Sequence, residues 1–323
     1  MQKEDFRIVF MGTPEIAVAS LEAIINEGYN VVGVITAPDK PAGRGRKIHY
    51  SEVKKFAMEK SLCLMQPENL KSPEFINELR DLQPQVQVVV AFRMLPHAVW
   101  SLPPLGTFNL HASLLPQYRG AAPINWALIN GETKTGVTTF FLDEKIDTGK
   151  IIAKKESQIL PDDTAGSLHD RLKILGAKLV LETLEKIRTG QVSTTDQQEL
   201  IPGHEPLKKA PKIFREDCRI NWNKPAKEIA NLIRGLNPVP GAFTEISSGN
   251  DDPIMMKIFE AAPIVEKHDF SPGKLFTDNK NYIKFSTPDG FIEVKNMQAA
   301  GKKRMETEEF LRGFDFSFAN PLD

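Results

Sequence analysis

RIVFMGTPEIAVASLEAIINEGYNVVGVITA, residues 7 to 37, contains two short apolar runs with a segment of helical spacing between them. The runs at 7–11 and 31–37 are rich in β-branched residues and apolar on both faces, which is typical of buried parallel strands. The intervening segment predicts a helix, with Pro14 near its first turn and Gly28 past its end. This order of strand, helix and strand favours a parallel α/β sheet.

The same alternation continues along the first part of the chain. Further strands are predicted at 86–92, 106–112 and 135–143, and one long amphipathic helix ends at Gly190. Residues 1–189 are therefore expected to form a doubly wound, mostly parallel, Rossmann-like α/β domain. Gly12 has no GxGxxG or P-loop pattern around it, so we expect it to allow a close backbone approach and not to bind a nucleotide.

The composition and the periodicity of the sequence change after Gly190. Residues 190–208 are polar, lack periodicity and carry turn residues, which predicts an interdomain linker. Residues 209–323 contain one predicted helix, at 225–236, and then several short strands separated by turn signals. We expect these strands to form a small C-terminal β-barrel, OB-like, or a sandwich.

Bulk composition excludes several classes of function. The 323 residues include 41 basic and 42 acidic side chains, so a net charge of -1 gives no global attraction to nucleic acid or membrane. Cys63 and Cys218 form neither a CxxC pair nor a metal spacing, which favours free thiols in a reducing compartment and no metal site. The N-terminus lacks a secretory or transit pattern, and runs such as VVVAF are too short to span a bilayer. We expect a cytoplasmic protein.

FNLHASLLPQYRGAAP, residues 108 to 123, holds the first candidate site. Asn109 and His111 are two residues apart on a predicted strand, so their side chains point to the same face. Polar side chains at the end of a strand in an open α/β sheet lie where such sheets bind ligands. The ordinary alternative is a histidine bonded to a backbone carbonyl beside an asparagine that caps a turn. Ser113 lacks the GxSxG pattern of a hydrolase nucleophile.

Asp147 adds a carboxylate in a tight predicted loop between two strands, ahead of Thr148 and Gly149. An aspartate in that place commonly caps a turn, which is the alternative role. Together with Asn109 and His111, it fits direct acyl-group transfer. The amide and imidazole would donate to a developing oxyanion, and the carboxylate would take the proton from an attacking amine.

Basic residues are concentrated in three stretches. PDKPAGRGRK, residues 38 to 47, has four positive charges and no acid after Asp39, and KKAPKIFR (208–215) and GKKRM (301–305) add further clusters. Each stretch by itself is compatible with a solvated surface. Because the net charge is near zero, however, such local clusters are where a polyanion would bind.

These stretches resemble one family. NLHASLLP followed by DEKIDTG resembles the formyltransferases that use 10-formyltetrahydrofolate, and FMGTPEIAVASLEAI, VVGVITAPDKPAGRGRK, YRGAAPI and INW with LIRGLNPVPGAF resemble the methionyl-tRNA formyltransferases among them. The likeness covers nearly the whole chain. It implies an enzyme that formylates initiator methionyl-tRNA with a folate co-substrate and no metal; nothing in the sequence suggests an obligate oligomer, so we expect a monomer.

The resemblance also implies roles for single residues. The family's catalytic trio falls on Asn109, His111 and Asp147. The folate site falls on Phe92, Arg93, Ser113, Leu114, Leu115, Pro116, Asp143 and Lys145, although the chain departs from the family pattern at Phe92, Arg93 and Lys145. The tRNA contacts fall on Lys40, Arg44, Arg46, Lys47, Lys212, Lys302 and Lys303.

Three other functions share parts of this pattern. A sugar-amine N-formyltransferase would keep the trio, but it has no evident need for the Arg- and Gly-rich loop at 38–47. A purine-pathway formyltransferase would have little use for residues 209–323. A noncatalytic RNA-binding module would not need Asn109, His111 and Asp147 together.

Overall fold

The computed structural model describes residues 2–42, 47–201, 206–246 and 253–316, and the chain forms two compact units. The first unit comprises Met1–Gly120, Lys134–Gln158 and His169–Lys209, and the second comprises Ala121–Thr133, Ile159–Leu168 and Ala210–Asp323. Because each unit collects separate stretches of chain, the units do not coincide with the contiguous segments 1–189, 190–208 and 209–323 expected from the sequence.

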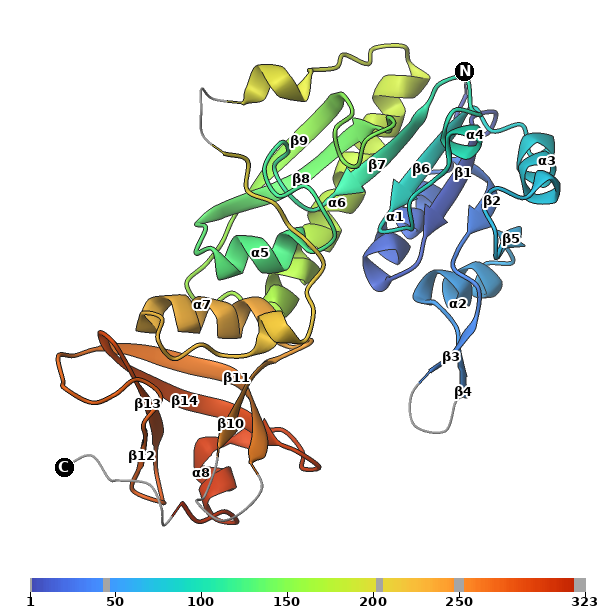
Figure 1. Ribbon diagram of the computed structural model, residues 1–323. Coiled ribbons are helices and arrows are strands. Elements are labelled where there is room, and N and C mark those ends of the chain that lie inside the picture. The colour runs from blue at the N-terminus through green and yellow to red at the C-terminus, as the bar shows by residue number, and fades with distance from the viewer. Residues whose placement is uncertain (1, 43–46, 202–205, 247–252, 317–323) are drawn as a thin grey trace. The chain divides into compact units, whose positions relative to one another are not determined.

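A seven-stranded sheet forms the centre of the first unit, in the order β5-β2-β1-β6-β7-β8-β9 (Figure 1). The first five strands in this order are parallel to one another, and β8 is antiparallel to both of its neighbours. The strands are β1 (Arg7–Gly12), β2 (Asn30–Ile35), β5 (Leu64–Met65), β6 (Val86–Val90), β7 (Thr107–His111), β8 (Lys134–Phe141) and β9 (Ile151–Gln158). The predicted doubly wound, mostly parallel sheet is confirmed.

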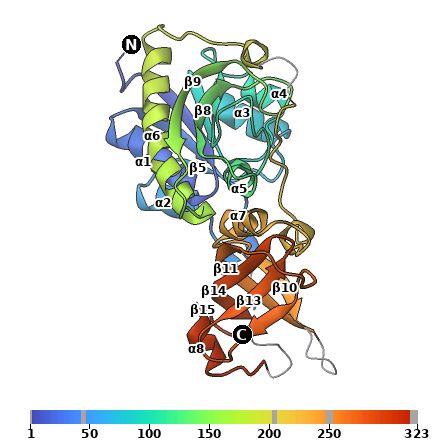
Figure 2. The same ribbon diagram turned by 90° about the vertical axis from the view of Figure 1, so that its left-hand side faces the viewer.

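Helices cover both faces of this sheet (Figure 2). Helices α3 (Pro73–Asp81) and α4 (His97–Trp100) pack on one face, over a core that includes Val9, Met11 and Val89. On the other face lie α1 (Glu15–Asn26), with α2 (Glu52–Glu59) beside it, and α6 (Ala165–Arg188). With both faces covered, β1 and β6 are buried along nearly their whole length, which is why their sequences are continuously apolar.

Local sequence signals account for several of these elements. Ser72 caps α3 by accepting a hydrogen bond from the backbone N–H of Phe75, and Gly28 takes the left-handed conformation after α1, at a φ of 81°. A Cβ atom on Gly12 would lie 2.5 Å from the Cβ of Ala17 and 3.1 Å from the carbonyl oxygen of Val90. Gly12 therefore permits the close backbone approach that was expected of it.

Two segments differ from the expectation of open loops. Part of the basic stretch forms a small antiparallel hairpin, β3 (Lys40–Ala42) with β4 (Lys47–His49), because its backbone groups pair with one another. The segment expected to be a linker contains the 3-10 helix η1 (Gln197–Leu200), and Thr195 pairs with Ile151 at the start of β9. This segment is therefore fastened to the first unit at that point.

The second unit contains an antiparallel sheet that curls into a half-barrel, in the order β10-β11-β14-β13-β12 (Figure 1), and β15 lies beside β14 (Figure 2). Its strands are β10 (Ala242–Ile246), β11 (Ile254–Val265), β12 (Leu275–Thr277), β13 (Ile283–Thr287), β14 (Gly290–Ala299) and β15 (Met305–Glu306). Its helices are α5 (Pro123–Ile129), η2 (Glu216–Cys218), α7 (Ala226–Leu236) and α8 (Thr307–Leu311).

Helix α7 joins the parts of this second unit. Ile229, Ile233 and Leu236 on α7 are buried in one core with side chains of the sheet. On another side of α7, the carbonyl of Gly235 accepts a hydrogen bond from Asn125 of α5 at 2.8 Å. A Cβ on Gly235 would come within 2.7 Å of Ile129, so the absence of a side chain there lets α5 and α7 pack closely.

Candidate functional site

Six of the predicted folate residues lie on loops at one edge of the first sheet. Strands β1, β6 and β7 are parallel neighbours, so their carboxyl ends meet at the same edge. Phe92 and Arg93 follow β6, and Ser113 to Pro116 follow β7. Ligands of open α/β sheets bind outside the carboxyl ends of the strands, which makes this edge the candidate active site.

Asn109 and His111 lie on β7, an interior strand of the sheet, and face the same side of it. Asn109 pairs with Val89 of β6 on one side and with Phe140 of β8 on the other, so its backbone is held by two neighbours. Its side chain is half-buried, and no residue in the described ranges is hydrogen bonded to its amide. The amide is therefore available to a ligand.

His111 is 6% exposed and has one ring nitrogen fixed by the fold. Its Nε2 donates a hydrogen bond of 2.8 Å to the carbonyl oxygen of Tyr118, and a carbonyl can only accept, so Nε2 carries a hydrogen. The other nitrogen, Nδ1, lies 3.9 Å from Oδ2 of Asp147. The carbonyl contact that was the ordinary alternative for His111 is thus present together with the carboxylate contact.

Asp147 lies in the loop between β8 and β9, with a backbone φ of 55°. Its Oδ2 accepts a hydrogen bond of 2.9 Å from the backbone N–H of Gly120. The turn within this loop is instead capped by Asp143, whose Oδ1 accepts from the backbone N–H of Lys145 at 3.0 Å and from the hydroxyl of Thr148 at 2.7 Å. Asp143 performs the capping, and Asp147 faces His111.

Gln197 holds the Asp147 loop through hydrogen bonds of its side-chain amide. No feature of the sequence predicted this role for Gln197. Its Nε2 donates to the carbonyl oxygens of Asp147 at 3.0 Å and Gly149 at 2.8 Å, while its Oε1 accepts two hydrogen bonds from the guanidinium of Arg119. Burial lowers the pKa of Arg119, and the negative charges of Asp147 and Asp143 oppose that shift. A glutamine in a polar, aperiodic segment gives no sequence signal of such a role.

The loop after β7 is held by internal hydrogen bonds. Ser113 is fully buried and donates through Oγ to the carbonyl of Gln117 at 2.7 Å, so its hydroxyl supports the loop. Thr138 donates to the carbonyl of Ser113 at 2.6 Å and accepts from the backbone N–H of Leu115 at 3.2 Å. Leu115 itself packs in a small core with Phe140 and Ile151. Folate contacts by Ser113, Leu114, Leu115 and Pro116 stay a prediction.

Arg93 fastens the loop after β6 to a neighbouring segment. Its guanidinium donates to the carbonyl oxygens of Glu68, at 2.9 Å, and Pro67. The Nε of Arg93 is buried and has no hydrogen-bond partner among the described residues. Burial also lowers the pKa of this guanidinium. An unpaired buried donor at this place fits an acceptor-rich ligand.

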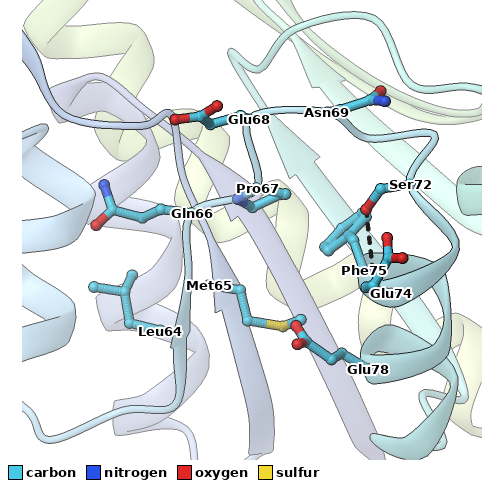
Figure 3. A pocket seen from close by; sticks show the side chains of 10 residues that line it. All are labelled: Leu64, Met65, Gln66, Pro67, Glu68, Asn69, Ser72, Glu74, Phe75 and Glu78. Carbon is cyan, nitrogen blue, oxygen red and sulfur yellow. Dashed lines mark hydrogen bonds between the residues drawn. The ribbon is translucent and has the colours of Figure 1, made fainter.

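A separate cavity of about 510 Å³ lies at the outer edge of the sheet, between β5 and α3 (Figure 3). Three carboxylates contribute to its lining, those of Glu68, Glu74 and Glu78, together with apolar side chains such as Met65 and Phe75. None of the predicted site residues lines it, although Arg93 donates hydrogen bonds to the carbonyl oxygens of Pro67 and Glu68, which do.

The predicted tRNA contacts are spread over the two units. Lys40 and Lys47 belong to the β3–β4 hairpin, and Arg44 and Arg46 lie outside the described residues. In the second unit, the ammonium of Lys212 lies 5.6 Å from the ring centre of Phe214, and Lys303 forms an exposed ion pair of 2.9 Å with Glu309. Lys302 is exposed in the turn after β14. Their contacts with tRNA stay predictions.

Several further observations apply to the described ranges alone. Within them, no three His, Cys, Asp or Glu side chains gather as a metal site, and no helix is long and apolar enough to cross a membrane. Cys63 and Cys218 are both free thiols, as expected, and burial raises the pKa of Cys218.

Comparison with known proteins gives matches along the chain. Residues 6–184 match the family described as formyl transferase, and residues 212–315 match the formyl transferase C-terminal domain. Methionyl-tRNA formyltransferase of Bacteroides thetaiotaomicron is 55% identical over 317 residues, which is 98% of each chain.

Two solved structures share the fold. HypX of Aquifex aeolicus, in complex with tetrahydrofolic acid, has a TM-score of 0.62 at 19% identity, covering 98% of this chain and 49% of HypX. WlaRD, a sugar 3N-formyl transferase solved with dTDP and 5-N-formyl-THF, has a TM-score of 0.63 at 22% identity, covering 92% of this chain and 99% of WlaRD.

Proposed function

Since the chain belongs to the formyl transferase family, we propose that it transfers the formyl group of 10-formyltetrahydrofolate to the α-amino group of methionyl-tRNA, the initiator in particular. The Bacteroides relative named for this reaction aligns with both units of the chain. The sugar-acting structure shares the fold at much lower identity. We therefore prefer methionyl-tRNA as the substrate over a sugar amine, which was the alternative from the sequence.

The observation that carries the proposal is the arrangement around β7. Asn109 presents an amide to which no described residue is hydrogen bonded, and Nδ1 of His111 faces Oδ2 of Asp147 at 3.9 Å. A donor pair beside a carboxylate is what an amine attacking an acyl carbon requires, since negative charge develops on oxygen while the nitrogen loses a proton.

We assign a distinct part of the chemistry to each side chain. The amide N–H of Asn109 would donate to the oxyanion that forms on the formyl group. Because Nε2 of His111 is held by Tyr118, the ring offers Nδ1 to the substrate. Donation to the oxyanion would use a hydrogen on Nδ1, the ring nitrogen that the Tyr118 carbonyl leaves free.

We assign the transfer of the amine proton to Asp147. The neutral α-amine attacks the formyl carbon, and the new bond joins the methionine nitrogen to that carbon. Asp147 accepts the proton that this nitrogen loses, the bond from the carbon to the folate nitrogen breaks, and Asp147 returns its proton to the departing nitrogen. No side chain forms a covalent bond in this sequence, which agrees with the structural use of the Ser113 hydroxyl.

Residues on two loops would hold the folate. The unpartnered Nε of Arg93 supplies a buried donor, and its guanidinium lies over the ring of Phe92 at 5.6 Å. Asp143 and Lys145 are exposed on the loop that carries Asp147. These four residues would bind and orient the donor, so that its formyl group lies beside Asn109.

The basic residues would bind the tRNA phosphates. Lys40, Arg44, Arg46 and Lys47 would contact the acceptor arm from the first unit, and Lys212, Lys302 and Lys303 would extend the contact on the second unit. We expect the enzyme to act in the cytoplasm and as a monomer.

A direct test compares two amine substrates with the purified protein and 10-formyltetrahydrofolate. We expect formylation of initiator methionyl-tRNA and none of a dTDP-linked amino sugar. In parallel, His111→Ala and Asn109→Ala should each lower the rate about a hundred- to a thousandfold, because each removes an oxyanion donor.

His169→Ala, on the surface of α6, serves as the histidine control and should retain activity. Formylation of the sugar but not of the tRNA would overturn the proposal that the substrate is methionyl-tRNA. Near-normal turnover by His111→Ala would overturn the mechanism.

A further inference from the structure

Gln197 is nearly inaccessible, at 1% exposure, although it lies in a segment of mostly exposed polar residues. All the hydrogen-bonding capacity of its amide is used. The two N–H groups reach two carbonyls of the Asp147 loop, and the oxygen receives the Nε and Nη2 of Arg119 at 3.0 and 2.6 Å. A buried polar group satisfied on every side holds its neighbours firmly in place.

The surroundings leave the amide one orientation. Carbonyl oxygens lie on one side of it and a guanidinium lies on the other. Rotating the amide by half a turn would oppose oxygen to oxygen and N–H to N–H, and all four hydrogen bonds would be lost. Gln197 is therefore a fixed link between the Asp147 loop and Arg119.

The Asp147 loop, which Gln197 holds, has a backbone conformation that is unfavourable by itself. Asp147 has a φ of 55°, in the left-handed region that residues other than glycine rarely occupy. Such a backbone persists where its surroundings fix it. One hydrogen bond from Gln197 ends on the carbonyl of Asp147 itself, and the other ends two residues later, at Gly149.

We propose that Gln197 is a positioning residue for the transfer reaction, one that fixes the carboxylate of Asp147 opposite Nδ1 of His111 through the Asp147 backbone. The inference rests on the role proposed above for Asp147. Gln197 itself touches no substrate. It acts on turnover by keeping the acceptor of the amine proton in its place.

The segment around Gln197 is anchored independently of its side chain. Thr195 and Ile151 exchange two backbone hydrogen bonds of 2.9 Å, and Asp196 caps η1 by accepting from the backbone N–H of Gln198 at 2.8 Å. Removing the Gln197 amide therefore leaves the path of the chain intact. A change in activity can then be assigned to the Asp147 loop.

The test uses the full-length enzyme and two substitutions of Gln197. Gln197→Ala removes every contact, whereas Gln197→Glu keeps the acceptor for Arg119 and removes both donors to the loop. We expect kcat to fall about a hundredfold in both, with KM for tRNA and folate little changed. Gln198→Ala, an exposed glutamine at the next position, is the matched control and should behave as the wild type.

A double-mutant cycle with Asp147→Asn separates positioning from a merely structural role. If Gln197 acts through Asp147, Gln197→Ala should cost little further turnover in the Asp147→Asn background. Additive losses, or a normal kcat in Gln197→Glu, would overturn the inference while leaving the proposed function in place.

A wrong assignment of the catalytic site would give a different experimental result from a wrong inference about Gln197. If Asp147→Asn alone kept full turnover, Asp147 would not be the proton acceptor, and the role of Gln197 would fall with it. If Gln197→Ala failed to fold, as judged by circular dichroism, Gln197→Glu would decide the question alone.

Discussion

At the scale of single residues, the candidate site depends on backbone conformation as much as on side-chain chemistry. Asp147 reaches His111 from a left-handed backbone, and a Cβ on Gly149, two residues later, would lie 1.7 Å from the carbonyl oxygen of Phe141. No side chain fits at position 149 unless the strands on either side move. The loop therefore has little freedom to present Asp147 elsewhere.

Asp147→Asn tests the charge of this residue alone. The amide oxygen can still accept from the backbone N–H of Gly120, so the fold should persist, but the proton acceptor is lost. We expect single-turnover formylation to slow by about a hundredfold or more, with an unchanged melting temperature. A variant that is fully active yet melts earlier would assign Asp147 to turn formation alone.

Gly149→Ala tests the backbone. The added methyl must displace the connection between β8 and β9, so we expect a loss of about 1–3 kcal/mol in the free energy of unfolding, together with a lower kcat. Urea denaturation and formylation assays measure the two effects. Gly313→Ala is the control, since nothing lies within 4 Å of a Cβ there. Equal behaviour of the two variants would contradict the steric argument.

The sequence could predict part of this site. Asn109 and His111 were found because residues two apart on a strand share a face, and β7 carries both. Gln197 could not be found, because its role depends on a hydrogen bond between residues 50 positions apart in the chain. The carbonyl of Tyr118, which fixes the His111 ring, is a backbone atom and has no side-chain signature at all.

At the scale of elements, the turn between β12 and β13 is organised by one carboxylate. Asp278 accepts hydrogen bonds from the backbone N–H groups of Lys280, Asn281 and Tyr282, and from the side chain of Asn281. Burial by itself would raise the pKa of Asp278, but these N–H donors outweigh it and lower that pKa below its usual range. The turn therefore binds the ionised form of the side chain.

The stability of the second unit should depend on pH through this turn. Because the pKa of Asp278 is lower in the folded state, its stabilisation is present above the unfolded pKa of about 4 and is lost as the pH falls through the folded value. We expect Asp278→Asn to melt earlier than the wild type at pH 7, and the gap to narrow below about pH 4. Thermal melts across that pH range measure the difference in melting temperature, with the exposed Asp269→Asn as control. A difference that does not depend on pH would contradict the role given to the Asp278 carboxylate.

Elements differed in how well their sequences predicted them. Buried strands such as β1 and β6 were predicted because packing on both faces demands an unbroken apolar run. The two-residue edge strand β5 and the β3–β4 hairpin were missed, since so short a pairing leaves no periodic pattern. For η1, the buried residue is itself polar, so hydrophobic periodicity could not reveal it.

At the scale of the whole molecule, a net charge of -1 means that affinity for tRNA must come from local clusters. Arg44 belongs to one of these clusters, the stretch at residues 38–47. We expect Arg44→Ala to weaken tRNA binding and to reduce the slope of log affinity against log salt by about one unit, while folate binding stays unchanged.

Affinity measured across a salt series, beside folate binding at fixed salt, provides the readout. Arg80→Ala, on the exposed face of α3, is the control for charge alone. An unchanged salt slope together with unchanged formylation would leave the 38–47 stretch as ordinary surface and would favour the sugar-amine substrate.

Residues 121–133 show where local patterns fail to predict the organisation of the chain. These residues lie within 1–189, the segment that the sequence assigned to the N-terminal domain, and residues 123–129 form a helix. In the structure this helix, α5, belongs to the second unit, since Asn125 and Ile129 pack on Gly235 of α7. A helical pattern marks an apolar face but cannot name the partner that will cover it.

That partnership sets an order of events during protein synthesis. Helix α7 leaves the ribosome roughly 100 residues after α5, which at bacterial and eukaryotic elongation rates corresponds to about 5–20 s. Until then, the apolar side of α5 has no α7 to cover it, even though most of the first sheet has already been made. The nascent chain therefore carries an uncovered face of α5 between the synthesis of Ile129 and that of Leu236, and a stall in this interval would prolong its exposure.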